Sequence, residues 1–142
     1  MKAIMRVSLV MFAVILAASA AASAVFEKSF IGLTYSTVSM TTSETITVLD
    51  GIYRRHSNDK KVVEHRLKKS ELSILSHLVG RLDLSMIDEL EVPSKRHRFD
   101  GAKLTTIKVQ IGQKLYISVP FDHDNPPHQL RPLADQLSSM HP

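Results

Sequence analysis

The sequence has 142 residues, with 18 Lys and Arg against 14 Asp and Glu, and it contains no cysteine. The lack of cysteine excludes a disulfide-stapled fold and lipid attachment at a signal-peptide cysteine. A formal net charge of +4 is too small to indicate a nucleic-acid partner, so we expect none.

The N-terminal residues have the composition of a secretory signal peptide. Lys2 and Arg6 are followed by an apolar run over residues 7–16 and by the small residues Ala22, Ser23 and Ala24. This order of charged, apolar and small-residue regions predicts a signal peptide over residues 1–24. The mature chain, residues 25–142, is then expected to form a single α+β domain.

The same residues leave an alternative open. Residues 7–26 carry no charge, and a stretch of that length could span a bilayer as an uncleaved anchor. The large apolar side chains end at Leu16, however, and small residues follow, which favours cleavage. We therefore expect a bacterial protein that is periplasmic or secreted, with no membrane span after cleavage.

The first half of the mature chain shows strand patterns joined by polar turns. Asp50-Gly51 is typical of a two-residue type I′ hairpin turn, which pairs Leu49 with Ile52. Four strands are expected, over residues 30–40, 43–49, 52–56 and 61–67.

A helix is expected next, because leucines recur at helical spacing from Leu72 to Leu82. Ser70 is the expected N-cap, and Glu71 lies where the helix dipole favours a carboxylate. A short helical turn is expected within residues 83–90, followed by a basic loop over residues 92–98.

Residues 105–111 and 115–121 alternate apolar and polar side chains and predict two half-buried strands around Gly112. A two-residue loop would pair Val109 with Tyr116 and place the two apolar rows on opposite faces of the sheet. A three-residue loop would pair Val109 with Ile117 and bury both rows on one face. Because burial of one face normally decides the register, we expect the three-residue loop.

A final helix is expected with Asn125 as its N-cap, and Pro132 either kinks this helix or marks its true start. The fold class is therefore α+β: an antiparallel sheet of about five to six strands, built from hairpins, with two helices packed on one face. This order of elements resembles the hairpin-plus-helix modules of proteinaceous enzyme inhibitors, and it implies no particular functional residue.

The densest polar cluster lies at the start of the final helix and comprises Asp122, His123, Asp124 and His128. Asp and His are ligands for transition metals, and a His beside a carboxylate can act as a general base. The cluster is equally typical of a capping loop or of a contact surface, and no recognised ligand spacing is present.

A second group is basic. Arg54, Arg55, Lys60 and Lys61 lie close together in the sequence, and the loop with Lys95, Arg96 and Arg98 could extend them into one patch. Such a patch would fit an anionic partner. The alternative is a set of solvated strand faces on which lysines protect a sheet edge.

No catalytic or cofactor motif is present, so we assign no catalytic, cofactor-binding or metal-binding residue and no cofactor. The first hypothesis is an exported, non-enzymatic binding module of the bacterial envelope: an inhibitor, an immunity-type protein or an accessory protein. Its partner would be an unknown protein or an anionic envelope component. The alternative is a small metal-dependent hydrolase that uses the Asp122–His128 cluster.

Overall fold

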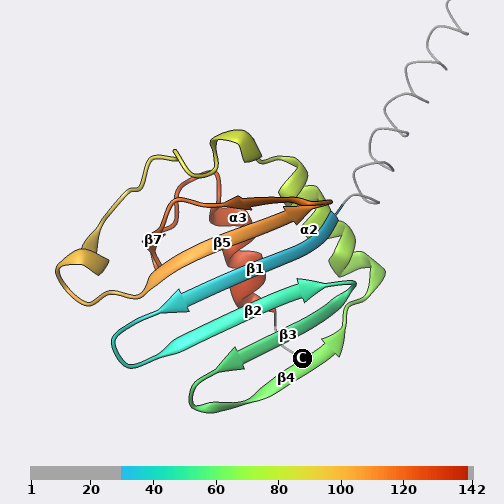
Figure 1. Ribbon diagram of the computed structural model, residues 1–142, viewed down its shortest axis with the longest axis horizontal. Coiled ribbons are helices and arrows are strands. Elements are labelled where there is room, and N and C mark those ends of the chain that lie inside the picture. Colours follow the sequence, from blue (N-terminus) through green and yellow to red (C-terminus); the bar gives the residue numbers. More distant parts are fainter. Residues whose placement is uncertain (1–29, 141–142) are drawn as a thin grey trace, which may run out of the picture.

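The computed structural model describes residues 30–140, so the predicted signal peptide lies outside the described residues. The elements are β1 (Phe30–Val38), β2 (Ser43–Leu49), β3 (Ile52–Ser57), β4 (Lys60–Arg66), α2 (Lys69–Gly80), η1 (Leu84–Met86), η2 (Arg96–Arg98), β5 (Leu104–Ile111), β6 (Lys114–Ile117), β7 (Phe121–Asp122) and α3 (Arg131–Ser139). A first group of strands, β1 to β4, is followed by a helix, and a second group, β5 to β7, is followed by another helix (Figure 1).

The strands form one antiparallel sheet in the order β4-β3-β2-β1-β5-β6, and the two-residue strand β7 pairs with β5. The central pair, β1 and β5, joins strands that are far apart in the sequence. The predicted α+β class with an antiparallel sheet is confirmed. Within residues 30–140, the expected five to six strands become six strands and the short β7.

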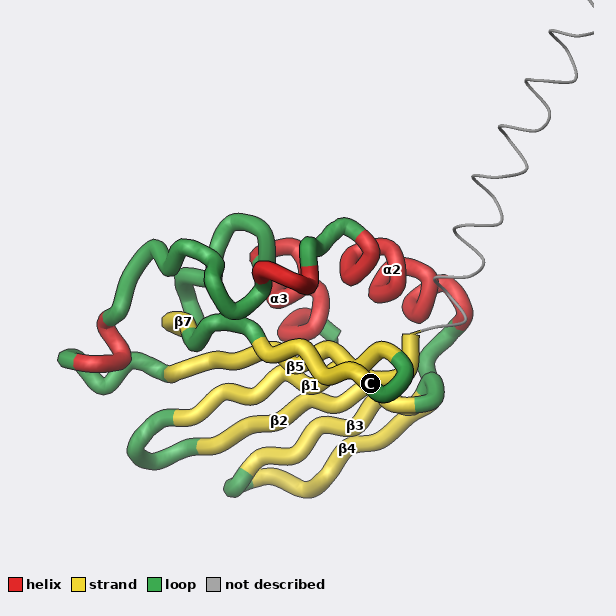
Figure 2. Tube along the Cα trace, turned by 45° about the horizontal axis from the view of Figure 1, so that its top comes forward, coloured by secondary structure: helices red, strands yellow, loops and turns green. Residues whose placement is uncertain are grey.

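The helices α2 and α3 lie on the same side of the sheet and contact each other (Figure 2). Side chains at alternate strand positions point toward them, so the sheet has one covered face and one open face. The core contains Leu33, Ile46, Val48, Ile107 and Val109 from the sheet and Leu75, Val79, Leu133 and Leu137 from the helices. Within residues 30–140, no helix is long and apolar enough to cross a membrane.

The predicted hairpin at Asp50-Gly51 is confirmed. Asp50 has φ of 50° and Gly51 has φ of 75°, as a type I′ turn requires. Leu49 pairs with Ile52, so the register also agrees with the prediction.

The predicted register of the β5–β6 hairpin is wrong. The turn has two residues, Val109 pairs with Tyr116, and Ile111 pairs with Lys114. The side chain of Tyr116 therefore lies on the covered side, while Leu115 and Ile117 lie on the open face with 56% and 43% of their surface exposed.

Two features explain this register. Gly112 adopts φ of 59°, which permits the tight turn. Ser118 is buried and fixes the far end, because its N–H donates to Ile107 O at 2.8 Å and its Oγ accepts from Ile107 N at 2.9 Å. The prediction assumed that both apolar rows must be buried, but β6 is an edge strand and its apolar row stays exposed.

Both predicted helix starts are displaced. Lys68, not Ser70, precedes α2, and the Lys68 N–H donates to Glu71 Oε2 at 2.7 Å, so Glu71 does satisfy a donor in the first turn. Pro132 lies in the first turn of α3 and marks its start, and Asn125 is not its N-cap.

Candidate functional site

The predicted cluster of Asp122, His123, Asp124 and His128 is not one site. Asp122 is buried and turns toward the loop that contains η2, whereas His123 turns toward hydroxyl groups of β1 and β5. Successive residues at the end of a strand point in opposite directions, which separates the two side chains. Asp124 and His128 are exposed.

The carboxylate of Asp122 is fully buried and accepts hydrogen bonds from three residues of the η2 loop. Oδ2 accepts from the Ser94 hydroxyl and from the Arg96 backbone N–H at 2.8 Å. Oδ1 accepts from the His97 backbone N–H at 2.8 Å and contacts His97 Nδ1 at 2.6 Å. One side chain therefore binds the backbone of a segment about 25 residues away in the sequence.

Burial by itself would raise the pKa of Asp122. The hydrogen bonds from Ser94 and from the His97 and Arg96 backbone outweigh burial and hold the pKa of this carboxyl well below its usual range. Asp122 is therefore ionised at neutral pH and can only accept hydrogen bonds, so His97 Nδ1 carries the proton. The Arg96 guanidinium, 3.9 Å from Oδ2, adds an opposite charge.

An aspartate that orients a histidine through Nδ1 also supplies two of the three members of a catalytic triad. The third member would be a nucleophile at the other ring nitrogen, Nε2. Ser94 donates to the Asp122 carboxylate, and among residues 30–140 no hydroxyl contacts His97 Nε2. Within the described residues, the Asp122–His97 pair therefore organises the loop.

His123 belongs to a second polar cluster under the sheet. Its Nδ1 lies 2.9 Å from the Tyr35 hydroxyl, 3.4 Å from Thr105 Oγ1 and 3.5 Å from Thr37 Oγ1. Burial raises the pKa of Tyr35, so its phenol stays protonated and can donate a hydrogen bond to His123 Nδ1. The two threonines contact each other at 3.2 Å, which closes the network.

The metal-dependent hydrolase would need the side chains of this cluster to converge on one ion. The described residues contain no group of three or more His, Cys, Asp or Glu side chains that could hold a metal ion. The exposed Asp124 forms an ion pair with Arg96, whose hydrogen bond lowers the pKa of Asp124. The cluster thus bonds to the loop and to the sheet rather than converging on one ion.

The predicted basic patch is also divided. Arg54 forms an ion pair with Glu64 at 2.7 Å. Arg55 is the next residue of β3, so its side chain lies on the opposite face of the sheet, and it forms an ion pair with Glu44. Lys60 and Lys61 are exposed at the start of the edge strand β4. The η2 loop adjoins β7 and β5, on the other side of β1 and β2 in the sheet order, so its cations do not extend this group.

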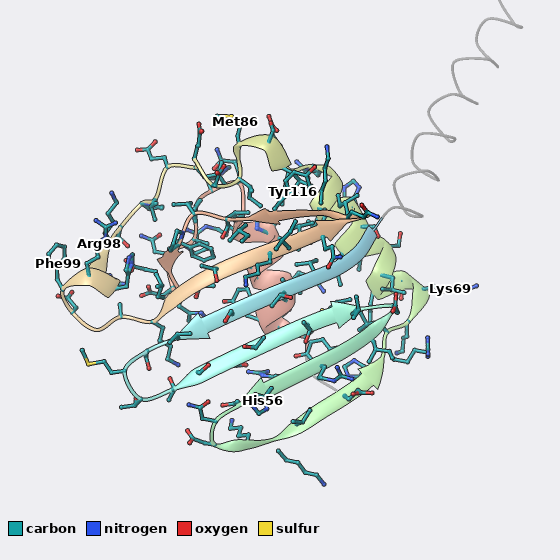
Figure 3. The ribbon with its side chains drawn as sticks, in the orientation of Figure 1. His56, Lys69, Met86, Arg98, Phe99 and Tyr116 are labelled. Atoms are coloured by element: carbon teal, nitrogen blue, oxygen red, sulfur yellow. The ribbon has the colours of Figure 1, made fainter. Side chains whose placement is uncertain are left out.

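A different surface emerges where β1 ends and β5 begins. Val38 pairs with Leu104, so the turn after β1 and the loop before β5 leave the sheet at the same end. We call this surface the loop end and define it by Met40, Lys95, Arg98, Phe99 and Lys103, all of which are exposed. Met40 is 95% exposed and Phe99 is 84% exposed, and Figure 3 shows Arg98 and Phe99 projecting from the molecule.

The loop that presents Phe99 is fixed at both sides. The Phe99 and Asp100 N–H groups donate to Arg96 O at 2.9 and 2.8 Å, and Gly101 turns the chain back with φ of 67°. The His123 N–H donates to Lys103 O at 2.9 Å. Together with Asp122, these bonds hold the exposed side chains on an ordered backbone.

Sequence reasoning missed three of the residues that build this site: Ser94, His97 and Phe99. Ser94 and His97 meet Asp122 only through the β5–β7 pairing, and no local spacing signals that contact. An isolated Phe among basic loop residues was a weak signal, because single exposed apolar residues are common on protein surfaces.

Comparison with known proteins gives no further assignment: no protein-family model matches this chain, and no curated protein or solved structure is significantly similar to it.

Proposed function

We propose that this chain is an exported, non-enzymatic binding module of the bacterial envelope, an inhibitor, immunity-type or accessory protein that binds a partner protein through the loop end. The observation that supports it best is Phe99, which is 84% exposed on a loop whose backbone is fastened to the buried Asp122 carboxylate. An aromatic side chain held in water on an ordered loop is suited to insertion into a partner.

The composition of the loop end favours a protein partner. Aromatic residues, Met and Arg are enriched at protein interfaces, and the loop end contains Phe99, Met40 and Arg98. A loop that is already ordered loses less conformational entropy on binding.

The charge of the loop end indicates an acidic partner surface. Lys95, Arg98 and Lys103 form no ion pair with any residue in the range 30–140, so their charges are available to a partner. Charge complementarity of this kind mainly accelerates association, and the effect weakens as salt is added.

Export is the second part of the proposal, and the charged, apolar and small-residue order of residues 1–24 supports it. The protein recovered from a periplasmic fraction should begin at Val25. An intact mass that includes residues 1–24, in protein recovered from membranes, would contradict export.

The binding proposal is tested with immobilised protein and envelope extract. We expect a partner that is captured by the wild type, is captured at least tenfold less by Phe99→Ala, and is released by salt. Ile74→Ala is the matched control, because Ile74 is also an exposed apolar residue but lies on α2. Equal capture by the wild type, Phe99→Ala and Ile74→Ala would contradict the loop end as the binding surface.

A further inference from the structure

The strand β6 forms one edge of the sheet, and its backbone has groups free to pair. Ser118 and Ile107 form a hydrogen-bonded pair, and in an antiparallel ladder bonded and non-bonded pairs alternate. The N–H and C=O groups of Tyr116 therefore face β5. Those of Leu115 and Ile117 face outward, away from the sheet.

The two edges of the sheet differ in their side chains. The outer edge of β4 has charged residues, which hinder pairing with another chain: Lys60, Lys61, Glu64 and Arg66. On β6, by contrast, Leu115 and Ile117 expose apolar surface beside their outward-facing backbone groups. The β6 edge thus has one charged residue, Lys114 at its first position, and is less protected than the β4 edge.

The available edge is short and has a defined end. Val119 N–H donates to Ile87 O at 3.0 Å, so past Ile117 the chain is covered by the segment after η1. Figure 3 places Tyr116 and Met86 along this upper margin of the molecule. The stretch open to pairing therefore corresponds to β6 itself.

We propose that the β6 edge is a self-association site, at which two copies of this chain pair β6 with β6 in antiparallel orientation about a two-fold axis at Tyr116. An extended strand is the occupant that can pair with outward N–H and C=O groups of an edge strand. A second copy of β6 fits because its apolar side chains would meet apolar side chains. In this register Leu115 of each copy lies opposite Ile117 of the other.

The charges agree with this arrangement. With the axis at Tyr116, the two Lys114 residues lie at opposite ends of the paired stretch, so their side chains are separated along the ladder rather than opposed. Four exposed apolar side chains meet on the open face, and the sheet continues across the interface. The contact is isologous, as two-fold symmetry requires. It is independent of the loop end.

Sedimentation of the purified protein over a range of micromolar concentrations tests the proposal. We expect the wild type to shift from monomer to dimer as concentration rises, and Ile117→Lys to remain monomeric. Val62→Lys is the matched control, since Val62 is an exposed β-branched residue on the other edge strand, 47% exposed against 43% for Ile117. It should dimerise like the wild type. A monomeric wild type, or a dimer that persists in Ile117→Lys, would overturn the proposal.

Cross-linking tests the register itself. Because the chain has no cysteine, every disulfide between single-cysteine variants is intermolecular. Opposite residues of a bonded antiparallel pair lie about 5.5 Å apart at Cα, within disulfide range. Leu115→Cys mixed with Ile117→Cys should therefore form more cross-linked dimer under mild oxidation than either variant alone. No excess in the mixture would rule out this pairing.

Discussion

The covered face of the sheet has two halves that are built differently. Figure 2 shows α2 and α3 beside one part of this face and β7 beside another. The apolar half includes Ile107 and Val109, whereas the half that contacts β7 has the hydroxyl groups of Tyr35, Thr37 and Thr105. Apolar packing stabilises a fold but has little directional preference. Hydrogen bonds are directional, so the polar half can fix a loop in one position.

Asp122 and Phe99 illustrate what the difference achieves. A buried carboxylate with its hydrogen bonds stabilises a fold little more than well-packed apolar side chains would. Removing the carboxylate alone is costly, however, because it leaves buried donors without partners. We infer that this polar half positions the loop end, while the apolar half supplies most of the stability. The predictions below separate these two contributions.

The largest effect is expected in the apolar half. Ile107→Ala removes a fully buried side chain and should lower the free energy of unfolding by about 2–5 kcal/mol, measured by chemical denaturation. Lys108→Ala, the exposed neighbour, should change it by less than about 1 kcal/mol. Equal losses in the two variants would contradict the assignment of the core face.

In the polar half, Asp122→Ala should cost about 2–4 kcal/mol, because each buried donor left unsatisfied costs about 1–3 kcal/mol. The donors are the Arg96 and His97 backbone N–H groups. Thermal unfolding measures the loss. Asp124→Ala is the control, since Asp124 is exposed and its ion pair with Arg96 should contribute little. A larger loss in the control would contradict the role of Asp122.

The pH dependence should follow from the same carboxylate. Its pKa is lowered in the folded state, so its stabilising effect is complete above the unfolded pKa, about 3.9, and is lost as pH falls below it. The difference in unfolding free energy between the wild type and Asp122→Asn should be constant above about pH 5 and shrink between about pH 4 and pH 2. If the difference in unfolding free energy instead grew as the pH falls, the lowered pKa of Asp122 in the folded state would be contradicted.

The smallest effect is expected in the second polar cluster. Tyr35→Phe removes one hydroxyl from the His123 network and should cost about 0.5–1.5 kcal/mol of unfolding free energy. Thr37 and Thr105 still surround Nδ1, so the ring keeps possible partners. A loss as large as that for Ile107→Ala would mean that this network, too, is essential to the fold.

Much of the fold could be predicted because its signals are local. The Asp50-Gly51 turn determines the register of its hairpin. The predicted N-cap of α2, Ser70, lies two residues from the observed one, Lys68, whose N–H donates to Glu71. The β5–β6 register could not be predicted from alternation, since it depends on whether β6 is an edge strand, which only the sheet order shows. For the same reason Leu115 and Ile117 were expected in the core.

The candidate site was less predictable. The sequence singled out Asp122, but not its partners Ser94 and His97, because a buried carboxylate is matched to its donors by tertiary structure. It also grouped Asp122 with His123, which are neighbours in the chain and face opposite sides in the fold. The two residues are adjacent and polar in the sequence, but they do not form one site in the structure.

Hydrogen exchange at individual backbone amides tests most directly whether Asp122 fixes the loop end. The Arg96 and His97 amides, which donate to Asp122, should be protected in the wild type and should exchange rapidly in Asp122→Ala. The Ile107 amide, which donates to Ser118 Oγ in the sheet, should stay protected in both proteins. Rapid exchange of Arg96 and His97 in the wild type, with Ile107 protected, would show that the loop is not fastened by Asp122.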